Sequence, residues 1–334
     1  MLFSARRYVS RYRLPALTFV AALAVCGCLT SIAHAQLERG SNPEPNGVRY
    51  GEPVSVFWQI GTVVQANQGP VRGLTVTIPI PTDWPEQTVK IVEEDFSPHV
   101  GNVGYRELAG NLKQMLVTIP GVDPGQEARA ALILEISTRP VLGPEDPESL
   151  VIPRNPPRDT RKFLGSSPYL NPRHRDVRRQ ALELMEEDGT DWEKVERIYD
   201  WVRDNITQSN DALTSAENTL ENGTGSAESI VNLFVALCRA AKVPARIVWV
   251  PNHQYAEFYL QDGEGNGIWL PCQVVGDREF GSMSDARPIL QRGENFTVPE
   301  KDDPYRYVPE LVRGTAGGGR PTVQFLRDQT AAPN

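Results

Sequence analysis

The stretch Gly225-Ser226-Ala227-Glu228-Ser229 opens an apolar helical pattern that runs from Ile230 to Ala241 and leads into Val243-Pro244-Ala245-Arg246. Gly225 can make a tight entry to a helix, and Ser226 belongs to the residue types preferred at the N-cap. Apolar residues then recur at helical spacing, which indicates a buried face. The stretch therefore predicts a core helix whose first turn, with its positive dipole end, is free to serve a site.

Three strands are expected after this helix, over residues 243–249, 253–260 and 268–274, with a Gly-rich hairpin turn between the second and the third. Alternate residues of a strand share a face, so His253 lies on the face opposite to that of Gln254.

The segment from about residue 163 to 282 resembles the transglutaminase-like superfamily through Pro244-Ala245-Arg246, His253 and Trp269. That family reads Gly-x-Cys at the start of a long helix, then a Pro-Ala-Arg turn, a His on the next strand and an Asp on the one after. The resemblance implies a papain-like fold. It also implies a Cys-His-Asp site, in which a thiolate attacks an amide carbonyl and the His carries the proton.

Two positions depart from the family pattern. Ala227 stands where the family has its cysteine, and Gln273 stands where it has the aspartate. A methyl group supplies no electron pair, so Ala227 cannot act as a nucleophile. The Gln273 amide oxygen can still hold one tautomer of His253. The resemblance thus implies a degenerate triad, with His253 and Gln273 retained and the nucleophile lost.

The chain ahead of this segment reads differently. Residues 48–141 hold short alternating strands separated by Gly and Pro, which predicts an antiparallel β-sandwich without chemistry of its own. Residues 142–162 are rich in Pro and charge and are expected to be a linker, followed by the transglutaminase-like domain over 163–300. Residues 301–334, with their Gly run, are expected to be a flexible tail. The predicted fold is therefore α+β, an N-terminal β-sandwich followed by an independent papain-like domain.

Two helices are expected between the linker and the core helix, near residues 175–187 and 191–206. Thr190 lies three residues before Glu193, a spacing typical of a capping box at the start of the second helix. Apolar residues recur on one face of that helix, so we expect this face to be buried.

The first 35 residues have the composition of a signal peptide. Arginines precede an apolar run, and Ala33 and Ala35 stand at the two positions that a signal peptidase reads. Cleavage before Gln36 would leave residues 36–47 as a polar lead and direct the protein to the periplasm or the medium. An uncleaved membrane anchor, or lipid attachment at Cys28, is the alternative.

Charge and composition exclude several classes of function. The net charge of −8 becomes −12 once the four arginines of the signal segment are removed. Such an acidic chain, without a basic block, argues against nucleic acid or anionic membranes as partners. No membrane contact is expected beyond the signal segment. No metal or cofactor is expected, because the histidines lack ligand spacing. One disulfide between Cys238 and Cys272 is possible, but two buried free thiols are expected.

Three functions remain open at this point. The first is an exported pseudoenzyme that binds or scaffolds a protein or peptide ligand. The second is an acyl transferase or amide hydrolase with a displaced nucleophile such as Ser226 or Cys272. The third is an envelope structural protein. A Ser or Cys within hydrogen-bond reach of His253 would favour the second, and the absence of a concave pocket the third. The oligomeric state stays open.

Overall fold

The computed structural model describes residues 47–67, 69–314 and 320–333. The expected signal peptide, Cys28 and residues 36–46 of the polar lead lie outside the described residues. Within the described ranges, no helix combines the length and apolar character needed to cross a membrane.

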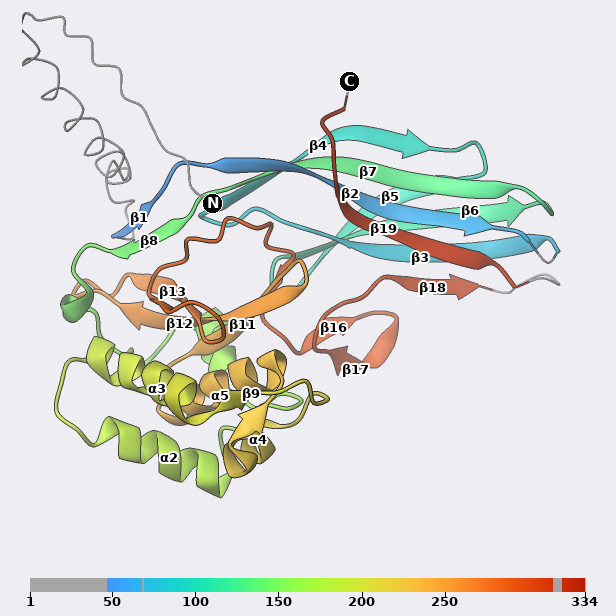
Figure 1. The fold of residues 1–334 in the computed structure, drawn as a ribbon. Coiled ribbons are helices and arrows are strands. Elements are labelled where there is room, and N and C mark those ends of the chain that lie inside the picture. The colour runs from blue at the N-terminus through green and yellow to red at the C-terminus, as the bar shows by residue number, and fades with distance from the viewer. Residues whose placement is uncertain (1–46, 68, 315–319, 334) are drawn as a thin grey trace, which may run out of the picture. The chain divides into compact units, whose positions relative to one another are not determined.

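A β-sandwich of two four-stranded antiparallel sheets forms the first part of the fold, as predicted (Figure 1). Apolar side chains from both sheets meet in one buried cluster. Apolar and polar residues alternate along these strands because every second side chain faces this cluster. One sheet has the order β18-β3-β6-β5, with strands Leu311–Gly314, Val71–Ile80, Leu112–Val122 and Asn102–Leu108. The other has the order β19-β2-β7-β4, with strands Thr322–Thr330, Val54–Gln65, Glu127–Thr138 and Gln87–Phe96.

The two outer strands β18 and β19 correct the expected flexible tail. β18 pairs with β3, and β19 pairs with β2 along its whole length, from Thr322 opposite Gln65 to Thr330 opposite Phe57. Val323 and Phe325 pack against the sandwich core. Burial of their apolar surface stabilises the paired strand relative to a free tail. The sandwich is therefore completed by the C-terminal end of the chain, and the helices and the second sheet are inserted between its strands.

The inserted part, from η1 to β17, is called the α+β part here. Its main sheet is antiparallel, with the order β14-β13-β12-β11-β15. These strands span Glu279–Phe280, Gly267–Gln273, His253–Gln261, Ala245–Val250 and Gln291–Arg292. The helices are η1 Pro147–Ser149, α1 Arg158–Arg161, η2 Lys162–Leu164, α2 Arg175–Met185, α3 Asp191–Asn205, α4 Ala216–Asn222 and α5 Ala227–Ala240. The small strands are β9 Thr207–Gln208, β10 Thr224–Gly225, β16 Phe296–Val298 and β17 Lys301–Tyr305.

The central helix α5 is almost wholly buried, which agrees with its continuous apolar sequence. It contacts α2, α3 and α4 as well as strands β11 and β12 of the main sheet. The predicted capping box at the start of α3 is confirmed. Thr190 N donates to Glu193 Oε2 over 2.7 Å, and Glu193 N donates to Thr190 Oγ1 over 3.2 Å.

The expected linker, residues 142–162, is held in place rather than free. β8, Val141–Pro144, pairs with β1, Val48–Tyr50, and both strands contribute to the core of the α+β part. Val151 exchanges backbone hydrogen bonds of 2.8 and 2.9 Å with Gln261. The segment is thus tied to β1 at its start and to the end of β12 through Val151.

A buried cluster of charged side chains joins the sandwich to the α+β part, contrary to the expected independence. Glu86, ahead of β4, pairs with Arg292 of β15. Arg292 also contacts Glu257 over 2.9 Å, and Glu257 in turn pairs with Arg246 over 2.6 Å. Burial alone would lower the pKa of the Arg292 guanidinium, but the charges of Glu257 and Glu86 outweigh it and raise that pKa.

Candidate functional site

Ala227 is the first residue of α5, and its side chain lines a cavity at the start of that helix. Ser226 is the N-cap, as predicted, and its Oγ accepts from Ser229 N over 3.3 Å. The Ser229 side chain is fully buried. Its Oγ lies 2.9 Å from Ser226 Oγ and accepts from Thr214 N over 2.9 Å.

The structure brings His253 and Gln273 together across the sheet. His253 begins β12 at the tight β11–β12 hairpin, and Gln273 ends β13. His253 Nε2 lies 2.9 Å from Gln273 Oε1. The amide oxygen only accepts, so Nε2 carries a proton, and in the neutral ring Nδ1 then keeps a free lone pair. That tautomer is the one in which a histidine could act as a base toward a neighbouring group.

The end of β13 is fixed by two side chains of α3. The Gln273 carbonyl accepts from Tyr199 Oη over 2.7 Å and from Arg203 Nη1 over 3.1 Å. Burial raises the pKa of Tyr199 to about 12, so its hydroxyl remains a donor at neutral pH. This support holds the Gln273 backbone in place beneath the histidine.

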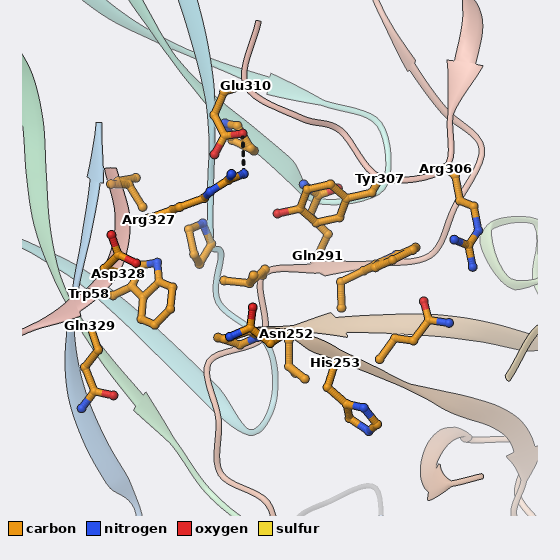
Figure 2. Close-up of a pocket in the computed structure, with 18 of the residues that line it drawn as sticks. Trp58, Asn252, His253, Gln291, Arg306, Tyr307, Glu310, Arg327, Asp328 and Gln329 are labelled. Atoms are coloured by element: carbon orange, nitrogen blue, oxygen red, sulfur yellow. Dashed lines mark ion pairs between the residues drawn. The ribbon is translucent and has the colours of Figure 1, made fainter. Parts of the chain in front are cut away.

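Ala227 and His253 line the same open cavity of about 910 Å³ (Figure 2). The volume is near the upper end of the range of small-molecule and peptide pockets, about 300–1,000 Å³. The α5 start and the β11–β12 hairpin form one wall of this cavity. The other walls come from sandwich strands β2, β3 and β19 and from the returning chain around residues 306–310. Gln273 does not line the cavity, so it acts on the site only through His253.

Ion pairs and aromatic rings mark the cavity wall. Arg306 Nη1 lies 2.6 Å from Glu228 Oε2, directly after Ala227, and Arg306 Nη2 donates to Asn232 Oδ1 over 2.9 Å. The Arg306 guanidinium also lies 4.9 Å from the ring centre of Trp249. Arg327 and Glu310 approach each other at 3.5 Å across the opposite wall, as the dashed line in Figure 2 shows.

Neither Cys238 nor Cys272 lines the cavity beside Ala227. Cys238 and Cys272 are free and buried, as predicted. Burial raises the pKa of both thiols, and a raised pKa keeps them protonated and unreactive at neutral pH. Among the residues that the structure describes, no serine or cysteine side chain hydrogen-bonds to the His253 ring.

The sequence did not predict the wall formed by the C-terminal chain. Arg306, Tyr307, Glu310 and Arg327 line the cavity, yet they fall within the segment expected to be a flexible tail. A signal was present in Val323 and Phe325, which alternate with polar residues as in a half-buried strand. The Gly317-Gly318-Gly319 run before these residues favoured a flexible tail over a strand.

Residues 178–274, which include α5, His253 and Gln273, match the family model of the transglutaminase-like superfamily. This chain contains a transglutaminase-like domain. The family expected from the Pro-Ala-Arg turn and the strand histidine is thereby confirmed. No curated protein matches the chain.

One solved structure agrees with this fold over most of the chain. A protein from Cytophaga hutchinsonii, proposed to be a cysteine protease, superposes with a TM-score of 0.53 at 16% identity over 85% of this chain and 94% of its own. A protein from Parabacteroides distasonis, proposed to be a protease, gives a TM-score of 0.27 at 15% identity over 72% of this chain and 48% of its own. At such identities the first similarity shows a shared fold and not a shared activity.

Proposed function

We propose that this protein binds a peptide or protein segment in the cavity beside α5 and does not carry out covalent catalysis there. One observation carries the proposal: the first residue of α5, which lines the cavity beside His253, is Ala227. Acyl transfer by this fold needs a thiolate at that place, and a methyl group cannot attack a carbonyl. The cavity supports a binding role, since a concave site has been kept without its nucleophile.

An active enzyme with a displaced nucleophile is less well supported. The Ser226 hydroxyl is used as the α5 cap, and an unactivated hydroxyl is a weak nucleophile. Cys272 is fully buried and its Sγ points to the backbone carbonyl of Ala256 over 3.6 Å. A purely structural role in the envelope is likewise less well supported, because it does not require an open cavity of this size.

We also propose that the protein is exported by the signal segment 1–35. The support is the arginine-rich start, the apolar run and the Ala33-His34-Ala35 sequence. Sequencing the N-terminus of the exported protein should give Gln36 first. A lipidated Cys28 or an intact Met1 in the membrane fraction would contradict this cleavage.

Restoring the thiol tests whether the site is assembled. In Ala227→Cys the new thiol should lie at the positive end of α5 and near His253, which together lower a thiol pKa toward about 6. At about pH 6 the gain in thiolate outweighs the loss of intrinsic nucleophilicity, so iodoacetamide should react roughly tenfold faster than with an ordinary thiol. Removing His253 should lower that rate.

The matched control is Ala109→Cys, the same substitution at an exposed position in the turn between β5 and β6. The wild type should show no thiol-dependent amide transfer or hydrolysis. If the Ala227→Cys thiol reacts no faster than the Ala109→Cys thiol, the site is not assembled. If the wild type turns over amide substrates, and His253→Ala abolishes this, the non-catalytic proposal fails.

A further inference from the structure

Gln254 is a buried polar residue whose side-chain amide has no partner. It follows His253 in β12 and lines the same cavity, yet it is only 3% exposed. Both its Nε2 and its Oε1 are buried without a hydrogen bond among the described residues. Most buried amides in proteins are paired, because the lost contact with water is otherwise not recovered. Gln254 therefore holds an unused donor and an unused acceptor at the cavity wall.

A second unpaired donor lies in the same wall. The two terminal nitrogens of Arg306 are engaged by Glu228 and Asn232, but its Nε is buried without a partner. The Arg306 guanidinium stacks near Trp249, and Trp249 is the residue directly opposite Gln254 in the β11–β12 pair. Trp249 thus has the Arg306 guanidinium near its ring and Gln254 as its partner in the neighbouring strand.

The unused atoms of these two residues are two donor nitrogens and one acceptor oxygen, which limits the chemistry of a ligand. An extended peptide presents the N–H and the C=O of one residue on the same edge, as in a hydrogen-bonded pair of antiparallel strands. A glutamine side chain can bond to both at once, and a further donor can share the carbonyl oxygen. A carboxylate ligand would leave the Gln254 acceptor unused.

We propose that Gln254, with Arg306 beside it, reads the backbone of one residue of an extended peptide bound in the cavity. A turn about the Gln254 side-chain bonds brings its amide from the wall to the ligand. The inference rests on the proposed binding function and specifies its ligand class. Because Gln254 would bind the peptide backbone, it would select for an extended peptide conformation and not for particular peptide side chains.

The cavity lining suggests a suitable probe. Asp328 lines the cavity and forms no ion pair within the described part of the chain, while Glu228 and Glu310 are each paired with an arginine. The aromatic rings of Trp249 and Tyr307 are 5.3 Å apart and offer a surface for aliphatic chains. The capped peptide acetyl-Lys-Val-Lys-Val-Lys-amide combines extended preference with charge opposite to that of Asp328.

Binding of this peptide is measured by calorimetry and by tryptophan fluorescence, because Trp58 and Trp249 line the cavity. Gln254→Met keeps the length of the side chain and removes both polar atoms, so the affinity should fall about tenfold. Gln324→Met, the same substitution at an exposed position of β19 outside the cavity lining, should change the affinity less than about twofold.

A series of peptides, each N-methylated at one backbone nitrogen, tests the same contact on the unaltered protein. One position should weaken binding to the wild type about tenfold and have little further effect on Gln254→Met, since both changes remove the same hydrogen bond. The inference is overturned if the wild type does not bind the peptide, or if it binds and no methylated position is coupled to Gln254. Alkylation of Ala227→Cys is independent of the peptide, so it reports separately on whether the site is assembled.

Discussion

Ala227 is the first residue of α5, and the elements that surround it do not require a cysteine at that position. The N-cap at Ser226, the hairpin that carries His253 and the hydrogen bond to Gln273 do not depend on a sulfur atom. Each is held by backbone pairing or by capping, which are properties of the fold. A substitution at the first residue of α5 can therefore remove the nucleophile and leave the cavity intact.

The two remaining thiols give a prediction at this scale. Cys238 and Cys272 are fully buried, and burial raises both pKa values, so the thiolate fraction is small at neutral pH and remains small as the pH approaches the ordinary thiol pKa of about 8.5. In the folded wild type neither should be alkylated by iodoacetamide at about pH 8. Mass spectrometry should find both alkylated once urea unfolds the chain. Rapid labelling of Cys272 in the folded protein would contradict its placement in the core.

The site residues differ in how well a sequence can reveal them. His253 and Gln273 were predictable, because family spacing and strand alternation place them without knowledge of distant contacts. Arg306 was not, since its role depends on contacts with Glu228 and Asn232, more than seventy positions away in the sequence. Gln254 was placed on the correct strand, but only the packing around it shows that its amide is unpaired.

At the scale of single elements, local signals were the reliable ones. α3 was expected over residues 191–206 and spans Asp191–Asn205, and its capping box has both predicted hydrogen bonds. Those bonds join residues three positions apart, so nothing outside the segment is needed to form them. Element boundaries set by local chemistry could therefore be predicted from the sequence.

The cap of α3 gives a prediction for this element. Thr190→Ala removes the Oγ1 acceptor of Glu193 N and should lower the free energy of unfolding by about 1 kcal/mol, measured by urea denaturation. Thr190→Ser keeps the hydroxyl and should stay within a few tenths of a kcal/mol of the wild type. An equal loss in both variants would show that the threonine methyl group, and not the hydrogen bond, supports the helix start.

β19 illustrates what a local signal leaves undecided. Its alternating residues are typical of a strand, but a strand needs a partner, and its partner β2 lies more than 250 residues earlier in the chain. No local rule connects the two, because pairing over such a separation depends on the whole fold. The C-terminal segment was expected to be flexible because of its Gly run, although the structure pairs nine of its residues with β2.

For the whole molecule, the return of the chain makes the two parts depend on each other. The sandwich cannot be completed until residues after the α+β part have been added, and buried Glu86 and Arg292 tie the two parts together. Removing one partner of a buried ion pair leaves an uncompensated charge, so separation of the parts would be costly. We expect one cooperative unfolding transition and no early proteolytic cut within residues 142–162.

Removal of β19 tests this dependence. A chain ending at Arg320 loses the pairing with β2 and the packing of Val323 and Phe325 on the sandwich core. The free energy of unfolding should fall by at least about 3 kcal/mol, because two apolar side chains and a full edge of backbone hydrogen bonds are lost. The change is measured by urea denaturation, followed both by circular dichroism and by tryptophan fluorescence.

The control is a chain ending at Thr330, which removes only residues after β19 and should unfold like the wild type. Because the two parts share a buried charged cluster, the loss in the shorter chain should appear in both signals at the same urea concentration. Two separate transitions, with the stability of the α+β part unchanged, would show that the α+β part folds independently. The cavity wall formed by β19 would then contribute nothing to the stability of that part. An unchanged stability would show that β19 does not pair with β2, and the cavity would then lack the wall that carries Arg327.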